Sequence, residues 1–479
     1  VGILLVPFFF VLIYKAKGKF NRKRLSGAGL ILLAAGTGLS SCQIGKSYTR
    51  PDMPLPARLD TLTQDTASIG DLSWWELYND TTLQQLIHRT LTYNKDLKIA
   101  SARMNELAAL KRIDFANMFP QATARLNGNR ETTNYGGDNF DADPELSLTA
   151  SISWELDLWG NLRWARDHST AEFLASVENC RAVKMGLVAQ VAQSYFELMA
   201  LDNELAIVRR TLEARREGVR LAEIRFKGGL TSEIVFQQAK VELAKTATMV
   251  PDLERRISLK ESEIALLTGD FPYAVNRNIL PEEIQLPDAL PLGLPSTLLE
   301  RRPDIRKAER ELMAAHAEVG LAYTNMFPRL ALTATLGTES ETLRDFLKSP
   351  YSYLAGNLLS PLFAMGKNRA ALKAKRAAYE GAVAEYEQTV LTAFKETHDA
   401  IINFNKIKDI YESRRQLAEA SRTAVELAQL QYINGVIGYL DLLDAQRNYF
   451  DAQVSLSNAV CNKQLMIINL YKALGGGWK

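Results

Sequence analysis

The chain has few of the residues on which catalysis and metal binding most often depend. Its 479 residues include only three cysteines and four histidines. Two of the cysteines, Cys180 and Cys461, lie in helical patterns, where a buried free thiol is expected rather than a disulfide. No nucleophile–base spacing, metal-ligand cluster or phosphate loop is present, so the sequence predicts neither an enzyme nor a cofactor. The histidines are scattered singly and are interpreted as surface or packing residues: His88, His168, His316 and His398.

The chain also lacks a bias in charge and a long apolar run. It has 57 basic and 55 acidic residues, which gives no indication of a nucleic-acid partner or an acidic substrate. Although 47% of the residues are hydrophobic, no apolar run of about 20 residues follows position 42. A membrane-spanning helix is therefore excluded from the mature protein.

The N-terminal region indicates an export signal followed by a lipid attachment site. Residues 15–24 are basic, residues 25–39 are apolar or small, and the sequence LSSC then ends at Cys42. This order is typical of a secretory signal, and LSSC resembles a bacterial lipobox, in which the cysteine is acylated. A standard signal peptide with an incidental cysteine is the alternative. Because Gln43 rather than aspartate follows, we predict a lipoprotein of the outer membrane, and we exclude residues 1–41 from the fold.

The mature chain contains an internal tandem repeat. The tetrapeptide NMFP occurs at 117–120 and again at 325–328, and the flanking residues align, for instance Gly229 with Gly435. The two copies differ in length only in the segment between their predicted helices. A doubled unit of about 200 residues favours a single elongated body over several globular domains.

After each NMFP the period of the apolar residues changes from helical to two. The clearest segment is 146–158, where one face is apolar and the other carries serine, threonine, glutamate and aspartate. A half-buried soluble sheet would give the same alternation, but in an exported lipoprotein the pattern favours an outer-membrane barrel. The residues predicted to face the membrane are Leu146, Leu148, Ile152, Trp154 and Leu156. Weaker segments at 122–129, 330–336 and 353–362 complete two predicted β-hairpins.

Four strands per chain predict an oligomer. So few strands cannot close a barrel, and open sheet edges cannot lie in lipid. Eight strands leave barely enough room for side chains, whereas wider barrels hold water. Three copies would supply twelve strands, and a dimer or a tetramer remains a geometric alternative.

The predicted helices are far too long for a globule. Residues 160–227 contain no proline and extend about 100 Å at 1.5 Å per residue, and residues 366–434 match them. Along 201–226, apolar residues recur at alternating spacings of three and four residues, which is a coiled-coil seam that Arg215 interrupts. A second seam along 188–198 predicts packing on two sides and closure into a cylinder; a two-helix arm would need only one seam. Shorter helices reach the same length when stacked end to end, 92–118 on 232–268 and 304–326 on 439–474.

Several motifs resemble those of one family. GLPS at 293–296 precedes LERRPDI at 299–305, and YING at 432–435 precedes LLDAQR at 442–447. With both NMFP copies and SYTRPDMPLP at 47–56, they resemble the TolC-like outer-membrane factors, in the lipoprotein branch that serves resistance–nodulation–division (RND) efflux pumps. The resemblance covers essentially all of the mature chain. It implies a mixed α/β membrane protein, a trimer with a 12-stranded membrane β-barrel and a long coiled-coil α-helical barrel, four strands coming from each chain.

The function that the resemblance implies is a passive exit duct of a tripartite efflux pump, which conducts drugs or other small toxic solutes to the exterior. The implied partners are two further copies of the chain, a periplasmic membrane-fusion adaptor, an inner-membrane RND pump and outer-membrane lipid. An outer-membrane duct for type I protein secretion and a pore-free coiled-coil scaffold lipoprotein are the alternatives.

The predicted boundaries divide the chain into consecutive segments. A proline-rich connector at 271–303, predicted to contain no helix, separates the two repeats. The segments are the signal region 1–41, a lipid-anchored and equatorial segment 42–90, repeat 1 at 91–270 with a β-hairpin at 121–158, the connector, repeat 2 at 304–474 with a β-hairpin at 329–363, and a tail at 475–479.

The turn at 434–438 is the candidate gate. From the residues alone, its acids are solvated groups at a helix N-terminus. The resemblance instead places the periplasmic tip of the tunnel here, and the positions that match the family's constriction are Tyr432, Leu440, Asp441, Asp444 and Arg447. On a threefold axis each aspartate becomes a ring of three that attracts cations.

The two hairpin turns differ in sequence, which suggests that the second one moves. Gln238 and Val235 stand in the first repeat where Asp444 and Asp441 stand in the second. Asp444 and Arg447 are expected to pair within or between protomers and to hold the entrance closed. Replacing both with alanine is therefore predicted to raise the conductance.

Overall fold

The computed structural model describes residues 43–54, 68–78, 80–133, 141–277, 295–342 and 344–478. The predicted signal region, the predicted lipidation site Cys42 and residues 278–294 of the predicted connector lie outside this part. The described residues form two compact units. The smaller unit combines Phe115–Ala165 and Gly320–Leu372 with the residues up to Ser47, and the larger unit contains the remaining helices.

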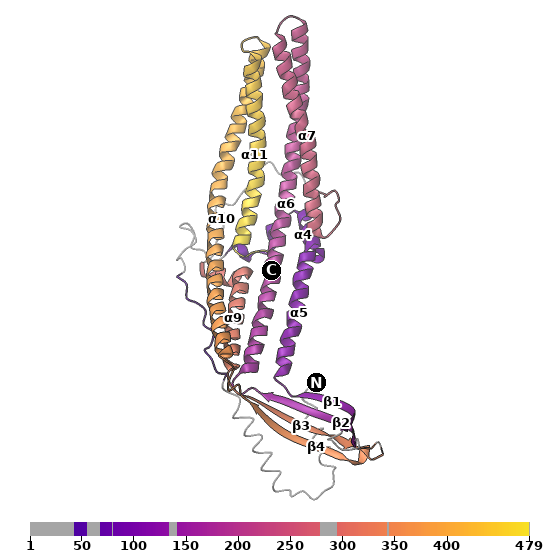
Figure 1. Ribbon diagram of the computed structural model, residues 1–479. Coiled ribbons are helices and arrows are strands. Elements are labelled where there is room, and N and C mark those ends of the chain that lie inside the picture. Colours follow the sequence, from indigo (N-terminus) through magenta and orange to yellow (C-terminus); the bar gives the residue numbers. More distant parts are fainter. Residues whose placement is uncertain are drawn as a thin grey trace. The chain divides into compact units, whose positions relative to one another are not determined.

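Two long helical hairpins make up most of the larger unit (Figure 1). In the first, α6 (Asn161–Lys227) is followed by α7 (Glu233–Thr268). In the second, α10 (Lys367–Ile433) is followed by α11 (Tyr439–Ala473). The long helices α6 and α10 contain 67 residues each and agree closely with the predicted ranges 160–227 and 366–434. No helix within the described residues has the length and apolar character needed to cross a membrane.

The turns of both hairpins depend on a glycine. Gly229 and Gly435 each have a φ of 75°, in the left-handed region that glycine adopts without steric cost. Because the two glycines occupy matching positions of the two repeats, the hairpins turn in the same way.

Shorter helices continue the hairpins, as the end-to-end stacking predicts. The Asn94 amide before α5 donates to the Leu267 carbonyl at the end of α7, at 2.9 Å. Arg302, just before α9, donates to the Ala473 carbonyl at the end of α11, at 3.1 Å. The shorter helices are η1 (Ile69–Asp71), α3 (Trp74–Leu77), α4 (Thr81–Tyr93), α5 (Lys95–Asn117), α8 (Pro295–Arg301) and α9 (Pro303–Thr324).

Two predictions about these helices are wrong in detail. The predicted helix 92–118 is divided between α4 and α5, because Asn94 leaves the helical region and its side chain caps α5 through the Leu97 amide at 3.1 Å. The predicted connector 271–303 contains the short helix α8. Pro295 and Pro303 stand at the first positions of α8 and α9, where proline starts a helix instead of interrupting one.

The core of the larger unit follows the predicted seams. Val188 and Tyr195 from one seam and Val208 from the other are at most 1% exposed, within one hydrophobic cluster. That cluster also contains residues of α4, α7 and α11. Helix α6 is therefore covered on more than one side, as a helix with two seams requires.

A four-stranded antiparallel sheet forms the smaller unit, in the order β1-β2-β3-β4 (Figure 1). The two predicted β-hairpins join into this single sheet because β2 of the first repeat pairs with β3 of the second. The strands are β1 (Gln121–Thr133), β2 (Asp141–Leu156), β3 (Arg329–Ser340) and β4 (Pro350–Leu359), and a short helix η2 (Phe346–Lys348) precedes β4.

Candidate functional site

The first candidate site is the apolar face of the sheet. Residues directly opposite each other in antiparallel strands project to the same side. Ile152 of β2 lies between Ala122 of β1 and Ala334 of β3, and Ala334 in turn lies opposite Leu354 of β4. The apolar face of β2 therefore continues across all four strands. Its residues on β2 include the five that the sequence predicts to face the membrane, Leu146, Leu148, Ile152, Trp154 and Leu156.

This face has the height of an outer-membrane barrel. The apolar residues of β2 run from Leu146 to Leu156, which at about 3.4 Å per residue and a tilt of about 40° gives about 26 Å. The apolar band of such barrels is about 25 Å tall. Leu354 and Leu126 on the same face are 83% and 69% exposed in the single protomer. The opposite face is polar, as Ser153 between Gln121 and Thr333 illustrates.

The second candidate site lies near the turns of the two helical hairpins, where an ion pair joins them. Arg447 of α11 pairs with Glu242 of α7. The same carboxylate accepts a hydrogen bond of 2.8 Å from Arg215 of α6, which also donates to Thr246 Oγ1 at 2.6 Å. We call Glu242, Arg215 and Arg447 the inter-hairpin latch.

The latch is largely hidden from solvent. The side chains of Glu242 and Arg215 are 5% and 10% exposed, whereas that of Arg447 is 44% exposed. A buried carboxylate is unfavourable unless it is paired, and Glu242 meets this requirement with two guanidinium groups. The hydrogen bond from Arg447 lowers the pKa of the Glu242 carboxyl, against the opposing effect of its burial. Burial lowers the pKa of the Arg215 guanidinium, which nevertheless stays charged at neutral pH.

Tyr432 also faces the first hairpin. The Arg225 guanidinium of α6 lies 4.7 Å from the centre of the Tyr432 ring, a cation–π distance. The Tyr439 ring lies 5.7 Å from the same centre. Both tyrosines border a groove of about 550 Å³ between the hairpins, with Leu442 and Leu443 on its apolar wall.

The other predicted gate residues, Leu440, Asp441 and Asp444, are exposed. Leu440 is 61% exposed. Asp441 accepts a hydrogen bond of 3.0 Å from the Gly438 amide and so caps α11. Asp444 accepts one of 3.1 Å from the Asn448 amide on the same helix.

The predicted pair between Asp444 and Arg447 is therefore not formed within the protomer, where Arg447 pairs with Glu242 instead. An exposed pair on one helix contributes little, whereas the buried Glu242 carboxylate needs a cation. A pair between protomers stays a prediction.

Glu242 is not among the site residues predicted from the sequence, although its position within an apolar stripe of α7 marks it as unusual. Glu242 and Thr246 are buried on the same stripe of α7 as Ala239 and Leu253, so a charged residue stands within a seam. Arg215 interrupts the seam of α6 in the same way, and these two seam-breaking charges are partners. The apolar periodicity of each helix identifies its own interrupting charge, but it does not predict that Arg215 and Glu242 are in contact.

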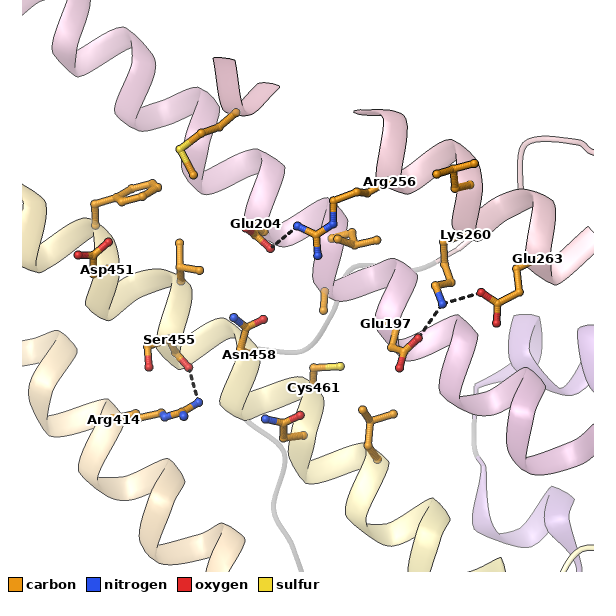
Figure 2. A pocket seen from close by; sticks show the side chains of 18 residues that line it. Glu197, Glu204, Arg256, Lys260, Glu263, Arg414, Asp451, Ser455, Asn458 and Cys461 are labelled. Atoms are coloured by element: carbon orange, nitrogen blue, oxygen red, sulfur yellow. Dashed lines mark hydrogen bonds and ion pairs between the residues drawn. The ribbon is translucent and has the colours of Figure 1, made fainter. Parts of the chain in front are cut away.

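A second groove, of about 980 Å³, lies farther from the turns among α6, α7, α10 and α11 (Figure 2). Several of its charged side chains are paired with one another, as Lys260 is with Glu197 at 2.8 Å and with Glu263 at 2.7 Å. Burial raises the pKa of the Cys461 thiol to about 12, so this thiol is not a nucleophile at neutral pH. Both Cys461 and Cys180 are free; Cys461 is buried as predicted, whereas Cys180 is only half-buried.

Comparison with known proteins gives matches along most of the chain. The family model "Outer membrane efflux protein" matches residues 86–270 and 294–476. The chain is 31% identical over 473 residues to outer membrane protein OprJ of Pseudomonas aeruginosa, which covers 95% of this chain and 97% of OprJ. It is 28% identical over 468 residues to the probable outer membrane lipoprotein SilC of Salmonella typhimurium, covering 96% and 99%. The solved structure of the outer-membrane channel OprN superposes with a TM-score of 0.85 at 31% identity, over 91% of this chain and 100% of that one.

Proposed function

The chain belongs to the outer membrane efflux protein family, and from that premise we propose that three copies assemble into one duct through the outer membrane. The protein is an outer-membrane channel that serves as the exit duct of an efflux system. In the proposed trimer, β4 of each copy pairs with β1 of the next, so that the three sheets form a single 12-stranded barrel.

The observation that carries the trimer is the sheet itself. Its apolar face is continuous across four strands, yet β1 and β4 are edges of the sheet within the described residues. Lipid offers no partner for the backbone groups of such edges. Pairing between copies satisfies these groups and leaves the polar face, with Ser153, around the water-filled lumen.

We propose that a periplasmic adaptor and an inner-membrane RND pump deliver drugs or other small toxic solutes to this duct. Membership in the family supports these partners. We also propose that Cys42 is acylated, which the lipobox and the likeness to SilC, a probable outer membrane lipoprotein, support.

The gate proposed for this duct is the inter-hairpin latch together with the exposed acids of α11. Arg447 connects the second hairpin to the first through Glu242, so breaking this pair frees α11 to move away from α7. Leu440, Asp441 and Asp444 are exposed in the protomer and are proposed to line the narrow entrance, where the acids favour cations.

Reconstitution tests the proposed function. The purified protein is expected to migrate as a heat-sensitive trimer and to form cation-selective channels in planar bilayers. Asp444→Asn removes one ring of charge and is expected to reduce the preference for cations while the trimer persists. A compact monomer without current would refute the duct, and unchanged selectivity would remove Asp444 from the entrance.

Acid is expected to weaken the latch. Because the pKa of Glu242 is lowered in the folded protein, the stabilisation by its charged form is complete above the ordinary glutamate pKa of about 4.3. It is lost as the pH falls through the lowered value. The charged groups that face this carboxylate are Arg215 of α6, Arg447 of α11 and Lys245 of α7, and all three carry a positive charge.

We therefore expect the open probability to be constant from pH 7 to about pH 5 and to rise below about pH 4.3. Single-channel recordings over this range provide the measurement. Glu242→Gln should abolish the acid-dependent rise, whereas Asp444→Asn should retain it. A rise that persists in Glu242→Gln would assign the acid response to another group.

A further inference from the structure

The groove between the turns of the two helical hairpins has the size of a ligand site. Helices α6, α7, α10 and α11 all contribute side chains to it, and its volume is about 550 Å³. Small-molecule sites in proteins measure about 300–1,000 Å³ and are lined mainly by apolar groups. Here the lining combines the buried side chain of Leu443 with Leu221 and Leu230, which are 47% and 73% exposed in the protomer. Apolar surface is therefore left uncovered beside a hollow that the fold has already formed.

The carboxylates that border the groove already have cationic partners. Glu242 is shared by Arg215 and Arg447 in the inter-hairpin latch. Glu217 accepts a hydrogen bond of 2.8 Å from Nε of Arg220 on the same helix. The negative charges at the groove are therefore balanced, and a cationic ligand would find no unpaired carboxylate among the described residues that line it.

One cation at the groove has no such partner. Arg225 is half-buried on α6, and no carboxylate within the described part of the chain pairs with it. Its guanidinium lies instead over the Tyr432 ring, 4.7 Å from the centre. A guanidinium that rests on an aromatic face keeps the N–H donors along its edge available, and this edge matches the geometry of a carboxylate.

From these observations we propose that the groove binds a small apolar anion, a solute with an aromatic or alkyl body and a carboxylate at one end. The body lies against Leu443 and Tyr439, and the carboxylate pairs with Arg225. The described residues that line the groove all belong to the larger unit, whereas the proposed membrane face belongs to the sheet of the smaller unit. The occupant is therefore a free solute and not a membrane lipid.

Such a ligand contacts both hairpins at once. Arg225 and Leu221 belong to the first hairpin, and Tyr439 and Leu443 belong to the second. The ligand therefore binds more tightly while the latch is formed than after the hairpins have separated. Because a ligand shifts an equilibrium toward the state that it binds more tightly, the anion is expected to lower the open probability. This effect rests on the proposed gate, whereas the binding site itself does not.

Calorimetric titration of the purified full-length protein in detergent, at neutral pH, tests the site directly. The probe is biphenyl-4-carboxylate, and biphenyl-4-carboxamide provides the same apolar body without the charge. The carboxamide is expected to bind about 10- to 100-fold more weakly, as loss of a hydrogen-bonded charge pair requires. Arg225→Gln should weaken the carboxylate by a similar factor and leave the carboxamide unchanged. Equal affinities of the two probes for wild type would overturn the site.

Lys227→Gln is the matched control for charge. Lys227 lies two positions from Arg225 on α6, is 72% exposed and pairs with Glu223, and it does not line the groove. The substitution removes the same charge from the same end of the helix and should leave the affinity for the carboxylate unchanged. Equal weakening by Lys227→Gln and Arg225→Gln would show a general attraction to positive charge and would overturn the site.

A second variant fills the groove without removing a charge. Gly218 lines the groove, and a Cβ atom there would meet nothing within 4 Å. Leucine also favours a helix more than glycine does, so Gly218→Leu is expected to fold. It should abolish measurable binding of the carboxylate and of the carboxamide alike. Unchanged binding of both probes would place them elsewhere on the protein and would overturn the site.

Recordings in planar bilayers separate the site from the duct. Biphenyl-4-carboxylate is expected to lower the open probability of wild type, and Arg225→Gln should need about 10- to 100-fold more of it for the same relative decrease. A channel that conducts normally but binds no carboxylate overturns the site and leaves the duct intact. Binding that depends on Arg225 in a protein that forms no channel retains the site and contradicts the proposed function. A rise in open probability on binding would overturn the stabilising role of the ligand.

Discussion

Glu242→Gln is expected to open the channel. The substitution keeps the shape of the side chain but removes the charge that Arg215 and Arg447 share. Hydrogen bonds to charged groups contribute about 1.5–3 kcal/mol, which corresponds to roughly 10- to 100-fold in the ratio of closed to open states. The measurement is the open probability in planar bilayers at neutral pH, with the thermal stability of the trimer recorded alongside.

A double-mutant cycle shows whether the pair itself is responsible. Arg447→Met also breaks the link between the hairpins, so it should raise the open probability in wild type and add little in Glu242→Gln. Independent, additive effects of the two substitutions would show that Glu242 and Arg447 do not act together.

Lys245→Ala is the matched control for the latch. Lys245 also approaches Glu242, at 3.4 Å, but it lies on the same helix and is 65% exposed. It cannot join the two hairpins, and exposed pairs of this kind contribute little. Its removal should leave the current unchanged. If Lys245→Ala opened the channel as far as Glu242→Gln, the charge near Glu242 and not the bridge between hairpins would be the cause.

Ile152→Arg is expected to prevent insertion of the sheet. Ile152 lies near the middle of the apolar face, and an arginine at the bilayer midplane costs about 2–4 kcal/mol. The proposed trimer carries this cost three times, and the sum approaches the total stability of a typical domain, about 5–15 kcal/mol. The expected result is loss of the membrane-integrated trimer, measured by membrane fractionation and by unheated gels.

The neighbouring residue provides the control. Ser153 points to the opposite face, between Gln121 and Thr333, and is exposed in the protomer. Ser153→Arg introduces the same charge one position away, into the proposed lumen, and should leave assembly intact. Equal tolerance of both variants would contradict the assignment of the apolar face to the membrane. Loss of assembly in Ser153→Arg alone would reverse the assignment of the two faces.

The sequence predicted the elements of this protein better than the contacts between them. The long helices α6 and α10, the glycine turns and the alternation along β2 all appear in the structure, because each depends on residues near one another in the chain. The joining of two hairpins into one sheet was not predicted. Alternation shows which face of a strand is apolar, but the β2–β3 pairing joins the two repeats and leaves no mark within either strand.

At the candidate gate, too, the sequence predicted local features better than contacts between distant residues. Spacing places Asp444 and Arg447 on one face of α11, and this local rule suggested that they pair. In the structure Arg447 reaches Glu242, a residue of the other hairpin, because a buried carboxylate competes for a cation more strongly than an exposed one does.

By itself, the sequence determined the doubled plan, the lengths of the helices and the two faces of the strands, since periodicity, proline and glycine act over a few neighbouring residues. Only the tertiary structure decided which charges meet between the hairpins and which arginine beside the groove rests on a tyrosine instead of a carboxylate. Both outcomes depend on the reach and burial of side chains that are far apart in the chain, and folding alone brings these side chains together.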